Sequence, residues 1–211
     1  MGGSRAAYRA VVPQLVAVGC AALAGELGFA NLTMGLLAER LGVRTPSLYE
    51  HVSGQEDLDR RIAALALSEA ADAVGVAVQG YAGRDALAAA TRAFRGFVPE
   101  HPGRYAATIG VEPTGPDDPM ASASQRLLDA FTAVLRGYEI KEGDVDHALR
   151  MLRGLCHGFA TSQAANGFQR SVDVDDGFEW LIAFADRGLR AGERRSAGPR
   201  GTERGRAPSK R

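Results

Sequence analysis

Apolar residues recur three and four positions apart through almost the whole chain, and this spacing is the feature that most restricts its fold. The alternating pattern of a half-buried strand is nearly absent. With 211 residues, of which 45% are hydrophobic, the chain can bury a substantial core and is not disordered throughout. The sequence therefore predicts an all-α fold, with helices over approximately residues 8–27, 34–41, 45–52, 55–78, 84–100, 103–109, 119–137, 142–166 and 174–190.

Residues that commonly begin or end helices support these boundaries. Thr33 stands at an N-cap position and Gly42 at a C-terminal stop. The run Ser-Gly-Gln-Glu at 53–56 has the pattern of a capping box, and we expect it to open the long helix that follows. The Asp118-Pro119 pair is expected to cap the helix over 119–137, and Gly167 to end the helix over 142–166.

The cysteine content and the N-terminal region bear on the compartment. Only Cys20 and Cys156 are present, which is too few for a disulfide framework, so a reducing cytoplasm is the expected location. The apolar run 11–25, preceded by Arg5 and Arg9, resembles the apolar region of a secretory signal. We interpret it instead as a buried helix, since a helix is needed before the motif described next. No stretch is long enough to predict a membrane span.

Residues 31–58 carry the most informative motif. Two short helices are joined by Gly42-Val43-Arg44, which has the length and the glycine of a helix-turn-helix. A small core is expected from Leu36, Leu37, Leu41, Val43 and Leu48. The second helix then presents polar groups outward that suit a DNA major groove, namely Arg44, Thr45, Pro46, Ser47, Tyr49, Glu50 and His51.

This segment resembles the N-terminal domain of the tetracycline-repressor (TetR) family of transcriptional regulators. The similarity rests on Leu32-Thr33, on the run 37–43 (LAERLGV), on the run 48–52 (LYEHV) and on Asp57-Leu58, all at the family's spacing. It implies a three-helix DNA-binding domain over residues 1–60. It also implies contacts to base edges or phosphates from Thr33, Arg44, Thr45, Pro46, Ser47, Tyr49, His51 and the Gln55 position.

Two departures from the family pattern remove positive charge from the predicted DNA surface. Gln55 stands where the family usually has Lys, and Gly35 where it often has Arg. Residues 1–60 hold five basic and six acidic residues, so we expect weaker DNA binding than a basic relative would show, or help from elsewhere in the chain. The basic segment 192–211, expected to be disordered, is interpreted either as an aid to DNA binding or as a solubilising extension.

The rest of the chain resembles a TetR-type C-terminal domain of the kind called WHG, which implies a helical effector-binding and dimerisation domain over residues 61–191. The similarity rests on the run 92–97 (RAFRGF) with His101-Pro102-Gly103-Arg104-Tyr105, on the run 154–159 (GLCHGF) and on Asn166-Gly167-Phe168. Leu155 or Cys156 replaces the characteristic Trp.

Two apolar stripes on the last two helices have helical spacing. They are interpreted either as the interface of a homodimer, which the resemblance favours, or as the core of the subunit. The stripe residues proposed for the interface are Leu152, Leu155, Phe159, Phe178, Leu181, Ile182, Ala185 and Leu189.

Apolar and aromatic residues of the middle helices are candidates for an effector pocket. Such residues are more often ordinary core, and His157 in particular can be a buried core histidine. The candidates are Phe94, Phe97, Tyr105, Ile109, Leu127, Phe131, Met151 and His157.

Three functions compete at this point. The favoured one is a DNA-binding regulator, expected to be a repressor, that binds palindromic double-stranded DNA as a homodimer and responds to a small molecule of unknown identity. A degenerate relative that binds a ligand or partner with weak DNA affinity is the alternative. An enzyme is disfavoured, because the adjacent Cys156 and His157 point about 100° apart on a helix. No catalytic residue, cofactor, metal or membrane partner is expected.

Overall fold

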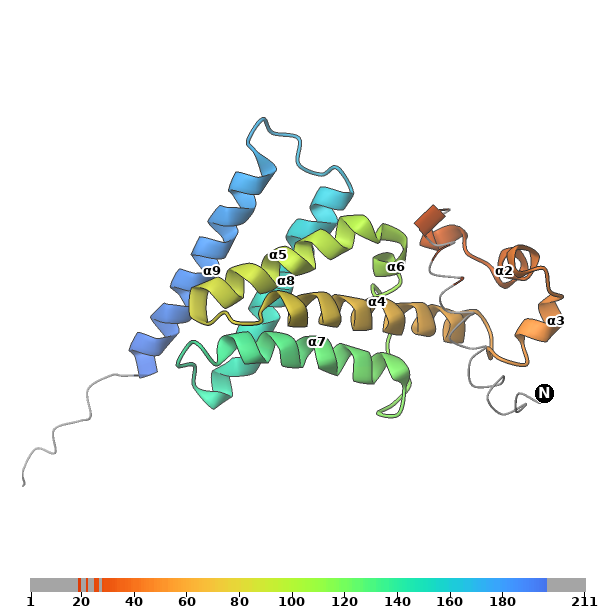
Figure 1. The fold of residues 1–211 in the computed structure, drawn as a ribbon, viewed down its shortest axis with the longest axis horizontal. Coiled ribbons are helices and arrows are strands. Elements are labelled where there is room, and N and C mark those ends of the chain that lie inside the picture. The colour runs from red at the N-terminus through yellow and green to blue at the C-terminus, as the bar shows by residue number, and fades with distance from the viewer. Residues whose placement is uncertain (1–18, 20–21, 23–24, 27, 197–211) are drawn as a thin grey trace, which may run out of the picture.

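The long helix α4 (Gln55–Ala77) organises the fold and runs lengthwise through the molecule (Figure 1). The computed structural model describes residues 28–196 and four earlier positions, 19, 22, 25 and 26. The first predicted helix therefore lies mostly outside the described residues, and so does the segment 197–211. Within the described part of the chain every regular element is helical, as the periodicity predicted.

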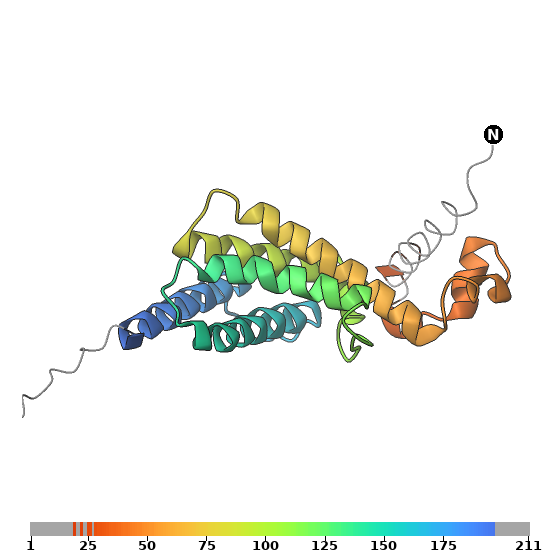
Figure 2. The ribbon, with the colours of Figure 1, turned by 90° about the horizontal axis from the view of Figure 1, so that it is seen from below.

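The helix-turn-helix lies at one end of α4. It consists of a 3-10 turn, η1 (Phe29–Asn31), then α2 (Met34–Leu41) and the single turn α3 (Thr45–Leu48). Gly42 adopts the left-handed conformation that ends α2, with φ of 66°. Figures 1 and 2 show α2 and α3 projecting beyond the helical bundle, at the end of the molecule where α4 begins.

The bundle contains the remaining helices. These are α5 (Gly83–Glu100), α6 (Pro102–Ala106), α7 (Pro119–Leu135), α8 (Val145–Ala164), which follows the 3-10 turn η2 (Glu142–Asp144), and α9 (Val174–Ser196). Helix α4 packs against α7 and α5, and α5 packs in turn against α8 and α9. No helix of the described residues combines the length and the apolar character needed to cross a membrane.

Two boundaries differ from the sequence-based expectation. Helix α8 ends earlier than expected, at Ala164, and the left-handed residue after it is Asn166 (φ 52°), not Gly167. Helix α9 continues to Ser196, beyond residue 192, where the basic segment was expected to begin. Helix α4 also runs through residue 60, so the two expected domains share one continuous helix.

Helix α9 is fastened to the bundle by apolar contacts and by ion pairs. Phe178, Ile182, Ala185 and Leu189 are buried inside the subunit. Arg92 of α5 forms a two-pronged ion pair with Glu179, with both N–O distances 2.7 Å. The apolar face of α9 is therefore occupied by its own subunit.

Candidate nucleic-acid interface and ligand cavity

The outer surface of α3 is polar and open. Arg44, Pro46, Ser47 and Tyr49 are exposed, and 55% of Tyr49 is accessible, whereas Thr45 and His51 are half-buried. The regular helix is shorter than predicted, because it gives way to a turn after Leu48. The four exposed side chains can meet a molecule that approaches this surface.

Helix α3 packs against a buried core whose residues differ in part from the expected ones. Leu37 and Leu48 are buried, as predicted, but Leu36, Leu41 and Val43 are 38–43% exposed. Leu36 lies about 100° around α2 from Leu37, and the other two stand at or beyond the last turn of that helix. Their places are taken by Leu32, Met34, Ala38 and Val52, and by Leu58 and Ile62 of α4.

Thr33 and Gln55 are placed differently from each other with respect to DNA. The Thr33 hydroxyl caps α2 by accepting a hydrogen bond from the Leu36 N–H at 3.3 Å, and its own proton stays available for donation. The Gln55 side-chain amide is half-buried and donates to Leu32 O at 3.2 Å and to Asp59 Oδ1 at 2.9 Å. Both amide hydrogens are thereby used within the protein, so the expected DNA contact from Gln55 is not supported by this geometry.

The capping box expected at residues 53–56 does not form. Gly54 is the N-cap of α4 and offers no side chain, with φ of 143°. Instead, Asp57 Oδ2 accepts from the Ser53 N–H at 2.9 Å. Burial alone would raise the pKa of Asp57, but this hydrogen bond and the Arg61 guanidinium hold its pKa below the ordinary value.

A cavity of about 450 Å³ lies within the bundle, between α5, α7, α8 and the segment 108–113. This volume is in the range of small-molecule sites. Phe97 is buried in the main core against His101, and Met151 packs on the same core, so neither lines the cavity. Six of the predicted residues do line it, namely Phe94, Tyr105, Ile109, Leu127, Phe131 and His157.

One corner of the cavity is polar. The Tyr105 hydroxyl and His157 Nδ1 are 2.6 Å apart. Burial raises the pKa of Tyr105 to about 12. Burial also lowers the pKa of His157, and the positive charge of Arg153 lowers it further. At neutral pH the corner therefore holds a protonated phenol, a neutral imidazole and the arginine.

Cys156 and His157 do not form a nucleophile–base pair in this arrangement. His157 bonds to Tyr105, and Cys156 is 1% exposed with a pKa that burial raises to about 12, so the thiol stays protonated. Within the described ranges, no three His, Cys, Asp or Glu side chains lie where they could hold a metal ion.

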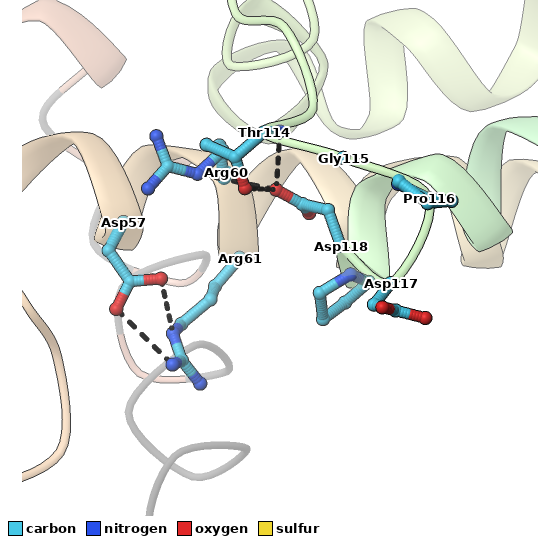
Figure 3. A pocket seen from close by; sticks show the side chains of 9 residues that line it. Asp57, Arg60, Arg61, Thr114, Gly115, Pro116, Asp117 and Asp118 are labelled. Atoms are coloured by element: carbon cyan, nitrogen blue, oxygen red, sulfur yellow. Dashed lines mark hydrogen bonds and ion pairs between the residues drawn. The ribbon is translucent and has the colours of Figure 1, made fainter.

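A second hollow, of about 400 Å³, separates the start of α4 from the segment 114–119 (Figure 3). Its walls are charged and already paired. Arg60 Nε lies 3.5 Å from Asp118 Oδ2, and Arg61 pairs with Asp57. Asp118 also caps α7 through the Met120 N–H at 2.8 Å, as the Asp118-Pro119 pair predicted. The hollow is therefore a junction between two elements and offers a ligand few free partners.

Met120 lies between the helix-turn-helix and the cavity of the bundle. It belongs to the buried cluster that contains Leu37 and Leu48 of the helix-turn-helix, and it also lines the apolar cavity. Ala107 and Ala123 lie in the same cluster. The core beneath α3 and the wall of the cavity are thus one continuous packing unit.

Residues 87–185 match the family model described as "Tetracyclin repressor-like, C-terminal domain". The chain is 31% identical over 156 residues to the uncharacterized HTH-type transcriptional regulator Rv0681 of Mycobacterium tuberculosis, covering 74% of this chain and 71% of that protein. The chain belongs to the TetR family. It is a DNA-binding transcriptional regulator of the helix-turn-helix type.

Another relative and two solved structures are also similar to the chain. The uncharacterized regulator YobS of Bacillus subtilis is 27% identical over 172 residues, 80% of this chain and 87% of that protein. A possible TetR regulator from Streptomyces coelicolor has a TM-score of 0.70 at 22% identity, covering 85% of this chain and 98% of its own. BioQ of Mycobacterium smegmatis has a TM-score of 0.66 at 20% identity, covering 84% and 97%. These structures show the same TetR fold.

Proposed function

We propose that a homodimer of this chain binds a palindromic operator through α3 of each subunit, represses transcription there, and is released when a small molecule fills the apolar cavity. The observation that carries the proposal is the outward polar surface of α3 above a buried anchor. Arg44, Ser47 and Tyr49 are exposed, while Leu48 and Val52 between and beyond them are 3% and 1% exposed. A recognition element needs this combination of rigid support and free polar groups.

Structural neighbours support both binding partners by analogy. BioQ has been described with its natural double-stranded DNA operator, and ActR of Streptomyces coelicolor with the ligand (S)-DNPA. ActR has a TM-score of 0.63 at 18% identity, covering 86% of this chain and 98% of its own. Because these neighbours share the fold, they support DNA binding by the helix-turn-helix of this chain and ligand binding in its helical bundle.

A second copy of the chain would dock on the outward faces of α8 and α9, not on the apolar stripes named above. Leu152, Phe178, Ile182 and Ala185 are at most 1% exposed within one subunit, which favours their role in the subunit core. The outward side of α9 instead presents Trp180 and Phe184, which are 65% and 49% exposed and stack with ring centroids 5.7 Å apart.

The neighbouring surface of α8 suits a close approach of helices. Gly154 and Gly158 are exposed one helical turn apart, and a Cβ added to either would meet nothing within 4 Å. An exposed aromatic pair on one helix and exposed small residues on another are features that a twofold interface can bury. The dimer would then set its two α3 elements about 34–36 Å apart, as successive major grooves require.

Release would operate through the packing unit around Met120. A molecule that enters the cavity contacts Met120 and the segment 109–113, which leads directly to Asp118 and its contact with Arg60. Displacing these residues changes the position of α4, and with it the separation of the two α3 elements. A ligand shifts this balance only by binding the released arrangement more tightly than the operator-bound one.

The test is an operator titration with a matched pair of tyrosine variants. Full-length protein is titrated onto DNA from the region upstream of its own gene, and binding is followed by fluorescence anisotropy. Tyr49→Ala is expected to weaken specific binding at least tenfold. Tyr81→Ala, which removes an equally exposed tyrosine (59%) at the α4–α5 turn, should leave binding unchanged. Equal binding by both variants would exclude α3 as the recognition element.

A further inference from the structure

The cavity has a mostly apolar lining, and its one basic side chain and its one imidazole, those of Arg153 and His157, both come from α8. Phe94, Leu127 and Phe131 form its aromatic and aliphatic wall, and the Phe94 and Phe131 rings meet edge to face with centroids 6.2 Å apart. The donors Arg153 and His157 lie together on α8. An occupant must therefore be mostly apolar, with its polar part confined to one end.

Arg153 differs from the other arginines that link helices in the bundle. Arg95, Arg104 and Arg126 each pair with a carboxylate of another helix at 2.5–3.0 Å. Arg153 is an exposed residue that also lines the cavity, and none of the described residues forms an ion pair with it. A guanidinium beside a largely apolar cavity is an effective partner for an oxyanion, since it can donate two parallel hydrogen bonds.

His157 adds a second donor next to it. A neutral imidazole carries one N–H and one acceptor nitrogen. When the Tyr105 hydroxyl donates to Nδ1 over their 2.6 Å separation, Nε2 carries the proton. No group of the described residues forms a hydrogen bond with Nε2, so this N–H is left for an occupant of the cavity.

The other charged residue of the lining is Glu112, an exposed residue of the segment between α6 and α7. Its carboxylate would repel an anion placed near it. The anionic end of an occupant is therefore directed toward α8, and the apolar end toward α5 and α7.

We propose that the cavity binds a mostly apolar molecule that carries one acidic oxygen group, such as a carboxylate or sulfonate. The acidic group lies against Arg153 and the His157 imidazole, and the apolar body lies against Phe94, Leu127 and Phe131. This inference rests on the proposed function, because it names the chemical class of the effector.

The experiment uses two fluorescent probes with one carbon skeleton. 8-Anilino-1-naphthalenesulfonate carries a sulfonate, and N-phenyl-1-naphthylamine lacks it. Each is titrated into full-length wild-type protein and into Arg153→Gln. The variant is expected to weaken binding of the sulfonate about tenfold, which corresponds to about 1.4 kcal/mol, and to change binding of the neutral probe less than twofold.

Two control variants locate the effect. Arg150→Gln removes an exposed arginine of the same helix that does not line the cavity, and both probes should bind it as they bind the wild type. Ser124→Trp places a large side chain in the cavity and should abolish binding of both probes. Circular dichroism and melting temperature report whether each variant is folded. Unchanged sulfonate binding in either Arg153→Gln or Ser124→Trp would overturn the proposal, as would an equal loss of both probes in Arg153→Gln.

Operator release provides a separate readout. If the sulfonate binds through Arg153 but leaves the operator complex intact, the ligand class stands and the proposed release mechanism is wrong. If Arg153→Gln binds the sulfonate as the wild type does, the ligand class is wrong, whether or not DNA is released.

Discussion

The Arg60 guanidinium of α4 lies 3.5 Å from the Asp118 carboxylate that caps α7, and both side chains are largely buried, at 19% and 5% exposed. The contact joins the helix that carries the DNA-binding tip to the segment that borders the ligand cavity (Figure 3). A second ion pair between the same two helices, Arg126 with Asp72, is exposed to solvent and serves as its natural control.

A double-mutant cycle should separate these two ion pairs. For Arg60→Gln and Asp118→Asn we expect a coupling free energy of about 1 kcal/mol, because partly buried charge-assisted pairs are little screened. Asn keeps an acceptor for the Met120 N–H, so the helix cap is preserved. For Arg126→Gln and Asp72→Asn we expect a coupling near zero. Urea unfolding measures both cycles, and equal couplings would contradict a special role for the Arg60–Asp118 contact.

The same aspartate should make stability depend on pH. Burial would raise the pKa of Asp118, but hydrogen bonds from Thr114 and Met120 and the charge of Arg60 hold its pKa below the ordinary 3.8. A lowered folded-state pKa stabilises the protein above the unfolded-state pKa, and this contribution is lost as the pH falls through the folded-state value. Asp118→Asn should therefore lower the melting temperature most at neutral pH, and the difference from wild type should shrink below pH 3.8. A difference that is constant from pH 7 to pH 3 would refute this origin.

Salt dependence should show how many phosphates the tip contacts. Arg44 is exposed and, within the described part of the chain, forms no ion pair, so it is available to a phosphate. Arg44→Gln should reduce the slope of log affinity against log salt by about one. Arg40→Gln is the control, because Arg40 already pairs with Glu26 at 2.7 Å and should change the slope less. A wild-type slope near zero would favour the alternative of a ligand-binding relative with weak DNA affinity.

The outward face of α9 should control the oligomeric state. Trp180→Glu places a charge in the proposed interface and should convert the dimer to a monomer in analytical ultracentrifugation. Val76→Glu alters a side chain of similar exposure, 68% against 65%, on α4 and should leave the dimer intact. A dimeric Trp180→Glu protein would show that the second copy docks elsewhere.

Gly137 should tolerate no side chain. A Cβ at this position would lie 2.6 Å from Gly83 N and 2.9 Å from Gly83 Cα, at the turn where the ends of α7 and the start of α5 meet. Gly137→Ala should lower the free energy of unfolding by about 1–3 kcal/mol, as overpacking typically does. Gly75→Ala, within α4 and with nothing within 4 Å of the added carbon, should instead stabilise by about 0.5–1 kcal/mol. Chemical denaturation distinguishes the two signs.

The sequence predicted the helices well because each carries its own signal. The hydroxyl of Thr33 and the carboxylate of Asp118 cap the helices expected of them, and Gly42 is left-handed. The cap of α4 was predicted wrongly because several acidic residues follow Ser53. The structure uses Asp57, one position beyond the capping-box spacing, and spacing alone could not select between them.

The sequence predicted which residues of the last helices are buried better than it predicted whether their own subunit or a second one covers them. The stripe through Phe178 and Ile182 is apolar at helical spacing and is buried, but by its own subunit. Periodicity reports that a face avoids water and carries no information on which surface covers it. Six of the lining residues were recognisable from the sequence as apolar or aromatic residues of the middle part of the chain. Arg153 and Glu112, its charged residues, were missed because isolated charges are common on helix and loop surfaces.

If a ligand releases this protein from DNA as proposed, the packing around Met120 would transmit the effect. The Met120 side chain packs in the cluster under α3 and also lines the cavity, so the two regions are in direct contact. A smaller or larger residue at this position would bias the unliganded protein toward one geometry while every DNA-facing and ligand-facing polar group stayed in place. Under the proposed function, substitutions of this single unbranched side chain, far from the DNA-binding surface, would yield variants that no longer hold the operator or no longer respond to a ligand.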